Sequence, residues 1–317
     1  MWFKTLHLYQ LQSPINSDPK SLSNTLEALA FKPCPKSLPQ SMGFVPPLPS
    51  INDHLALAQK HFMLLQLRIE QKVLPPAVVR EQLNQQVKEF EQKAGRRMYK
   101  DEKERLKDEV YHTLLTQAFT QSSYVNGYID TEKNWLIIDC ANEKKRAHFA
   151  SMLHKALQNP ITALALKPGA PVLTQWAQGS NQPHDLYLNQ ACLLKSPEEN
   201  GIVARIKNEN LLTENIQRFL ASGAQVIELA VGWNEQIKAT IRPDFSLSGI
   251  RFSDAVKEQS FDPSGQSKEE QMATDFLIMA ETLQHYISAV LPYFIEGSSA
   301  ASITDVSSIR NDQTVDA

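Results

Sequence analysis

Segments with the pattern of β-strands come in adjacent pairs along this chain, and this constrains its fold more than any other feature. Residues 124–130 and 135–140 flank a four-residue turn, as the strands of a hairpin do. Residues 225–233, 237–241 and 247–252 also follow one another closely. Strands joined by short turns pair antiparallel, whereas a doubly wound sheet needs a helix between its strands. We therefore expect an α+β fold with antiparallel strand pairs and long helices.

Further strands and helices are predicted elsewhere. Alternation of apolar and polar residues predicts a strand at 2–11, and richness in Leu, Ile and Phe predicts one at 61–73. The short segment 202–207 also has the character of a strand. The six prolines of residues 33–49 predict an extended, irregular loop. Apolar residues at helical spacing, with Pro75-Pro76 and Asn142 as start signals and Gly223 as a stop signal, predict helices. These helices are expected from Pro76 onward and at 21–30, 99–118, 142–158, 213–222 and 269–295.

The length and composition of the chain bound its organisation. A chain of 317 residues with 42% hydrophobic residues can build a large core. The segments become shorter near residue 165, so we expect one unit over residues 1–296, divided into two or three α+β subdomains. Residues 297–317 are rich in Ser, Thr, Asn and Asp, which predicts a disordered tail.

Several classes of protein find no support in the sequence. The three cysteines are widely separated and form no CxxC pair, which indicates reduced thiols in a cytoplasmic protein. No apolar run approaches the roughly 18 residues of a membrane span. Phosphate-binding loops, HExxH, GxSxG and EF-hand motifs are missing. We therefore expect no catalytic residue, no metal site, no cofactor and no membrane partner.

A cluster of basic residues is the strongest functional signal. Residues 93–107 contain seven basic and three acidic residues, in a chain whose formal net charge is −3. Lys93, Arg96, Lys100, Lys103 and Lys107 recur at spacings of three and four, so one helix would place them on one face. Such a stripe suits the phosphate backbone of DNA. The alternative is an ordinary solvated helix face, and Gly95 could break the helix.

The ordered set of segments resembles the RdgC family of recombination-associated proteins. The resemblance is carried by WFK at 2–4, ALAFKPC at 28–34, MGFVPPL at 42–48, KVLPPAVV at 72–79, LKDEVYHTLLTQAF at 106–119 and LIIDCANEKKRA at 136–147. Looser matches follow at 173–179 and 273–283, so the similarity spans nearly all of residues 1–295.

This resemblance implies a function without enzymatic activity. Members of the family are expected to bind single- and double-stranded DNA with little sequence preference. An elongated protomer would form a ring-shaped homodimer that encircles DNA and restrains the RecA recombinase. The resemblance thus implies a cytoplasmic, nucleoid-associated protein with a basic lining inside an acidic exterior.

The resemblance also assigns individual residues. Phe119 corresponds to a phenylalanine at the gate where two subunits meet; the alternative is that Phe119 packs beneath its own helix. Arg205 and Lys207 match positions that face the DNA channel. The family then carries a Lys-Gln pair, where this chain has Asn208-Glu209. The full set of candidate DNA-binding residues is Lys93, Arg96, Arg97, Lys100, Lys103, Lys107, Arg205 and Lys207.

Two other functions remain open from the sequence. A protein-interaction module could regulate the recombinase by direct contact, with only weak affinity for DNA, and the net negative charge and Glu209 favour this alternative. A metal-dependent nuclease would need a cluster of carboxylates, and the sequence offers none that we can identify.

Overall fold

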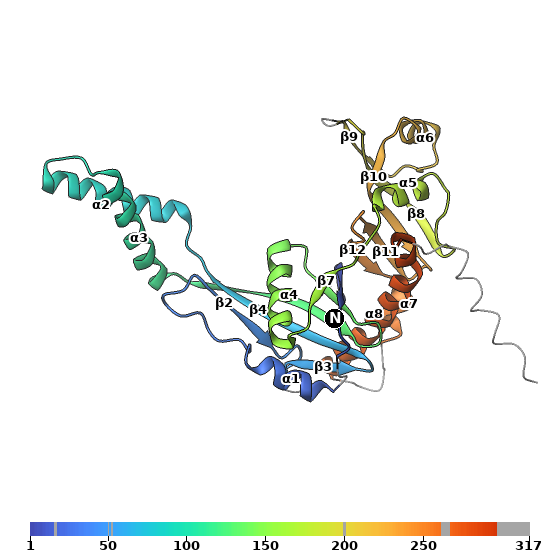
Figure 1. Ribbon diagram of the computed structural model, residues 1–317, viewed down its shortest axis with the longest axis horizontal. Helices are drawn as coiled ribbons and strands as arrows, with labels where there is room; N and C mark the ends of the chain where they lie inside the picture. The colour runs from blue at the N-terminus through green and yellow to red at the C-terminus, as the bar shows by residue number, and fades with distance from the viewer. Residues whose placement is uncertain (16–17, 50, 52, 199–200, 261–266, 297–317) are drawn as a thin grey trace, which may run out of the picture.

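The protein is elongated and curved. The computed structural model describes residues 1–15, 18–49, 51, 53–198, 201–260 and 267–296. A helical arm occupies one end of the molecule in Figure 1, and strands with a short helix occupy the other. The tail predicted at 297–317 lies outside the described residues.

One antiparallel sheet runs through the described residues. Its strands are β1 (Thr5–Leu11), β2 (Gln40–Val45), β3 (Ala56–Gln59), β4 (Phe62–Lys72), β5 (Thr120–Asp130), β6 (Trp135–Asp139), β7 (Ile161–Ala163), β8 (Leu186–Lys195), β9 (Val203–Lys207), β10 (Gln225–Trp233), β11 (Ile237–Ile241) and β12 (Leu247–Phe252). Their order is β2-β4-β5-β6-β1-β12-β11-β10-β8-β9, with β3 on β4 and β7 on β1. All pairings between these strands are antiparallel, which confirms the expected fold class.

Helices pack on both faces of this sheet, except α2 and α3, which project from it as an arm. They are α1 (Pro19–Glu27), α2 (Pro76–Ala94), α3 (Lys100–Gln117), α4 (Glu143–Leu157), α5 (Gly169–Ala177), α6 (Glu214–Ala221), α7 (Asp254–Glu258) and α8 (Lys268–Val290), followed by the 3-10 turn η1 (Leu291–Phe294). Asn142 caps α4, as the sequence predicts, because its side chain accepts a hydrogen bond from the backbone of Lys145. None of the described helices has the length and apolar character of a membrane span.

Two hydrophobic cores lie on opposite faces of the central strands. On β5, Tyr128 belongs to the core under α8, and the next residue, Ile129, belongs to the core under α1 and α4. This follows from the alternation of side chains along a strand. The ring of Tyr128 lies 5.6 Å from that of Phe276 on α8. On the other face, Phe149 of α4 packs edge-on against Phe44 at 5.8 Å.

The half of the sheet formed by β12, β11, β10, β8 and β9 is covered by the described helices on one face only. Helix α8 runs along the outer side of the curve in Figure 1, with β10, β11 and β12 inside it. Leu229, Ile241 and Leu247 belong to the α8 core. The opposite face of these strands carries polar and small side chains, and this face forms part of the candidate site.

A helical hairpin extends the other end of the molecule. Strands β4 and β5 are 11 residues long, so they run about 36 Å and carry α2 and α3 well away from the cores. Lys72, a buried residue at the end of β4, donates a hydrogen bond of 2.7 Å to the carbonyl of Leu115. A cation at the C-terminus of a helix is favourable. Lys72 therefore anchors the end of α3 to the sheet.

The structure corrects parts of the sequence prediction. The proline-rich loop contains a strand, β2, which pairs with β4. Strands β3, β7 and β8 and helices α5 and α7 were not predicted, and the last helix ends at Val290 rather than 295. The division into two or three subdomains stays a prediction.

Candidate nucleic-acid interface

The basic cluster of residues 93–107 does not form one helical stripe. Helix α2 ends at Ala94, where Gly95 adopts a left-handed conformation with φ 63° and donates to the carbonyl of Glu91. Glycine adopts this conformation without steric cost, so it ends the helix here. Helix α3 begins only at Lys100. The prediction that all five residues share one face is therefore wrong, and Gly95 is the physical reason.

Arg96 is held by neighbouring side chains within the turn. Its two terminal nitrogens lie 2.9 and 2.8 Å from the carboxylate oxygens of Glu102, and its guanidinium lies over the rings of Phe90 and Tyr99. The hydrogen bonds from Arg96 lower the pKa of Glu102 to about 2. Among the candidate DNA-binding residues Arg96 thus has a carboxylate partner that DNA would have to displace.

Three lysines form a shorter cationic stripe on α3. Lys100, Lys103 and Lys107 are exposed, and their spacing places them on one face of the helix. No ion pair of these lysines occurs within the described residues, and the same holds for the exposed Lys93 and Arg97 nearby. These charges are therefore available to an anionic partner.

Phe119 is exposed at the base of the helical arm. Its side chain is 87% exposed, although its backbone carbonyl accepts a hydrogen bond of 2.8 Å from Val73. The alternative that Phe119 packs beneath its own helix is therefore wrong for the chain described. Large exposed aromatic side chains are unusual on a monomer surface and are typical of contact sites. Val73, Leu38 and Tyr124 are also exposed apolar residues of this region.

The second group of candidate DNA-binding residues lies on the open face of the sheet, which is the face of β8 to β12 opposite the α8 core. Arg205 and Lys207 are exposed on the edge strand β9, opposite Leu193 and Ala191 of β8. Alternation along the strands continues this face onto β10 and β11, where Ala230 pairs with Thr240. Arg205 and Lys207 thus border a hollow of about 210 Å³ over small side chains.

Further cations on this face were missed in the sequence. Lys238 of β11 and Arg251 of β12 are exposed register partners, and Arg242 forms an ion pair of 2.9 Å with Glu228. The sequence contained a signal for the exposure of Lys238, because the pattern IKATI places it between Ile237 and Ala239, which are buried. Only the register between β11 and β12, however, brings Lys238 and Arg251 together.

A histidine on β1 is kept neutral near this face. Burial, and then the positive charges of Arg146 on α4 and of Arg242, lower the pKa of His7 to about 4, and Asp244 opposes this shift. His7 therefore adds no positive charge at neutral pH.

The departure from the family pattern at Asn208-Glu209 ends β9. Asn208 has a φ of 56°, a left-handed conformation that asparagine tolerates better than most residues. Glu209 is exposed, and its backbone donates a hydrogen bond of 3.4 Å to the carbonyl of Gln190. The effect of this pair on binding stays a prediction.

The structure does not bring the two candidate groups together within one chain. The arm with the α3 lysines and the strand β9 with Arg205 and Lys207 lie at opposite ends of the molecule (Figure 1). Within the described residues, no group of three or more His, Cys, Asp or Glu side chains is arranged to hold a metal ion.

Fold and surface together define an elongated α+β protein with exposed cations at both ends. The comparisons with known proteins make this specific. A family model described as "Putative exonuclease, RdgC" matches residues 1–296. Proteins named "Recombination-associated protein RdgC" are similar over almost their full length. That of Halorhodospira halophila is 34% identical, with 93% of this chain and 98% of the relative covered. That of Aeromonas hydrophila is 32% identical, with 92% and 96% covered.

The chain belongs to the RdgC family. The resemblance stated from the sequence is thereby confirmed, and the chain is a recombination-associated protein by the name of its relatives. The two names that the family carries differ on one point, because one states an exonuclease and the other does not.

Proposed function

We propose that this protein binds single- and double-stranded DNA without sequence preference, as a ring-shaped homodimer that restrains the RecA recombinase. It acts without enzymatic activity, in the cytoplasm and on the nucleoid. The observation that carries the proposal is a set of exposed cations that form no ion pair among the described residues, in a chain of formal net charge −3. These cations are Lys93, Arg97, Lys100, Lys103, Lys107, Arg205, Lys207, Lys238 and Arg251.

We expect the affinity for DNA to fall steeply with salt and to be similar for unrelated sequences. Lysine and arginine that reach phosphates release counterions and do not read bases. If about six phosphates are neutralised, log K falls with log salt with a slope near −5 on duplex DNA. Fluorescence anisotropy with two unrelated duplexes over a range of salt concentrations measures both quantities. A flat salt response, or a strong preference for one duplex, contradicts the proposal.

A dimer explains how distant cations can act on one DNA molecule. Exposed apolar residues occur at both ends of the curved chain: Phe119 and Val73 on the arm, and Ile202, Val203 and Leu212 near β9 and α6. One two-fold axis that passes through both ends of the molecule would join arm to arm and β9 to β9. The two curved chains would then close into a ring. The inner faces of both chains would then surround one duplex.

We therefore expect a homodimer in solution. The mass of one chain is 35.7 kDa, and sedimentation at micromolar concentration should give about twice this value. Replacing Ile202 by Glu should weaken the contact at the β9 end, because a buried charge without a partner is costly at an interface. A wild-type protein that sediments only as a monomer removes the ring.

The alternative is a regulator that contacts the recombinase and binds DNA weakly. The net negative charge and the exposed Glu209 favour it. The two functions differ when DNA is present in excess over RecA: a protein that competes for DNA loses its effect, whereas a direct inhibitor keeps it.

The exonuclease in the family's description is a separate question. Incubating end-labelled single- and double-stranded DNA with the protein and Mg²⁺ or Mn²⁺ tests it directly. Our proposal expects intact DNA, and shortening of the labelled strands with time contradicts it.

A further inference from the structure

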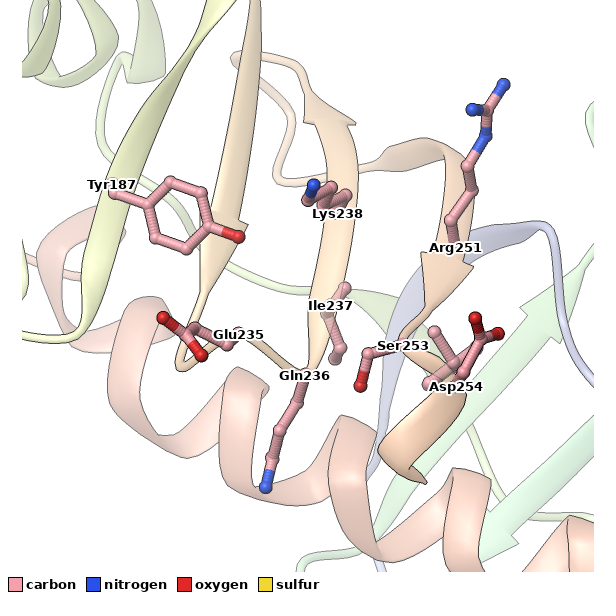
Figure 2. Close-up of a pocket in the computed structure, with 9 residues that line it drawn as sticks. Tyr187, Glu235, Gln236, Ile237, Lys238, Arg251, Ser253 and Asp254 are labelled. Carbon is pink, nitrogen blue, oxygen red and sulfur yellow. The ribbon is translucent and has the colours of Figure 1, made fainter. Parts of the chain in front are cut away.

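A pocket on the open sheet face has a composition suited to one nucleotide. It has a volume of about 650 Å³ and lies across the ends of β10, β11 and β12 (Figure 2). This volume falls within the usual range of small-molecule sites. Its walls carry an aromatic ring, two cations and two carboxylates, from Tyr187, Lys238, Arg251, Glu235 and Asp254.

The aromatic ring lies directly over a glycine. A Cβ atom built on Gly232 would lie 2.1 Å from Cζ of Tyr187, so a larger residue at this position would displace the ring. Gly232 and Tyr187 are register partners on β10 and β8. In Figure 2 the hydroxyl of Tyr187 points toward the strand that carries Lys238. The space over Gly232 thus lets the ring of Tyr187 lie against the sheet, where the ring forms a platform.

The two cations lie side by side without a partner of opposite charge. Lys238 and Arg251 are directly opposite each other on neighbouring strands, where like charges repel and destabilise the sheet. In the part of the chain that the structure describes, neither of them forms an ion pair. Such an arrangement is stabilised by an anion, and arginine beside lysine suits a phosphate.

The two carboxylates of the pocket lie apart: in Figure 2, Glu235 lies on the side of Tyr187 and Asp254 on the side of Arg251. Asp254 lies 3.3 Å from Lys257, so its charge is partly compensated. Glu235 lies in the turn between β10 and β11 and has no ion-pair partner among the described residues. Carboxylates accept hydrogen bonds from the N–H groups of nucleobases, including the N3–H of thymine. Glu235, on the side of the ring, can therefore accept a hydrogen bond from a base that stacks on Tyr187.

We infer that this pocket holds one unstacked nucleotide of single-stranded DNA. The base stacks on Tyr187, and its phosphate lies on Lys238 and Arg251. Aromatic platforms beside a basic groove are how proteins bind single strands without reading their sequence. A duplex keeps its bases stacked and paired, so it cannot use the platform. The inference rests on the proposed DNA-binding function and assigns a distinct subsite to single strands.

The neighbouring surface favours a strand over a free nucleotide. Next to the pocket, two residues along β11 from Lys238, a row of small side chains crosses the sheet: Ser248, Thr240, Ala230 and Ala191. This row ends at Lys207, beside Arg205. The pocket therefore lies beside a row of small side chains that leads to further cations, and the continuing backbone of a strand could follow this row.

Substitution of Tyr187 tests the platform. We expect Tyr187→Leu to weaken binding of a labelled oligo(dT) about tenfold, since stacking of one base contributes on this scale. Tyr187→Phe is the matched control and should bind as the wild type does, because it keeps the ring. Both variants should bind a duplex of equal length with unchanged affinity. Equal losses on both forms of DNA, or no loss with Leu, overturn the inference.

The cations are tested by the salt dependence of the same binding. Lys238→Gln with Arg251→Gln should reduce the slope of log K against log salt on oligo(dT) by roughly 0.7, because the contact to one phosphate is lost. Thymidine monophosphate in excess should not displace the oligonucleotide if a strand is the ligand, whereas displacement identifies a mononucleotide site and contradicts the inference. A wild type that binds neither form of DNA would refute the proposed function itself, which is a different result.

Discussion

Replacing Lys100, Lys103 and Lys107 by Glu lowers the affinity for duplex DNA about a hundredfold at moderate salt. Three phosphate contacts are lost, and three carboxylates are set against the phosphate backbone. The fold should be unaffected, because the three side chains are exposed on one face of α3 and form no ion pair within the described residues. Anisotropy titrations with duplex DNA measure the loss, and thermal melting and sedimentation check the fold and the dimer.

A second triple variant separates position from total charge. Lys20, Lys32 and Lys268 are also exposed and lie outside the arm. Their replacement by Glu changes the formal net charge by the same amount. If the stripe on α3 contacts DNA, this control keeps most of its affinity. Equal losses in the two variants would mean that the overall charge, and not the stripe, governs binding.

The turn between α2 and α3 shows what the sequence can and cannot predict about this site. Gly95 is visible as a helix breaker, and the structure confirms that it ends α2. The pairing of Arg96 with Glu102 depends on the conformation of that turn and is not contained in the helical spacing. Spacing therefore predicts which lysines share a face on α3, but the geometry of the turn decides which cations are free.

The unpredicted elements have tertiary causes. Strand β2 lies in a proline-rich segment, and it forms because its residues pair with β4 while Gly43 lets the chain at Phe31 approach closely. Strand β8 was missed because its pairing with β10 contains irregularities in register, which interrupt the alternation of its side chains. The hairpin of β5 and β6, by contrast, depends on a local turn and was predicted from the sequence.

The open sheet face also combines features that follow from the local sequence with features that depend on strand pairing. The exposure of Arg205 and Lys207 follows from alternation along β9 and agrees with the sequence. Their neighbours on the face come from strands distant in the sequence, and the pairing of Lys238 with Arg251 depends on the irregular register between β11 and β12. A single sequence predicts which face of a strand is polar, whereas the composition of a surface across several strands depends on their pairing.

Replacing Phe119 by Ala should leave the fold and the affinity for linear DNA intact but shorten the retention of closed circular DNA. The side chain is 87% exposed, so its truncation removes no buried volume from the chain itself. A buried phenylalanine would instead cost about 3–5 kcal/mol of stability. If Phe119 lies where two arms meet, its loss removes an aromatic anchor from that contact, and such anchors carry much of the binding energy of an interface.

The comparison of linear with circular DNA isolates the closure of the ring. A protein that only grips phosphates releases both forms at the same rate when salt is raised, whereas a closed ring slides off linear ends and stays on a circle. We expect wild-type protein to remain longer on circular DNA and Phe119→Ala to lose this difference. Phe119→Trp should restore it, because the larger ring can fill the same contact. Lys72 and Val73 hold the backbone of this region to the sheet, so the loss is assigned to the side chain only if the melting temperature is unchanged. A large fall in melting temperature, with retention lost in proportion to unfolding, would contradict the position of Phe119 at a gate.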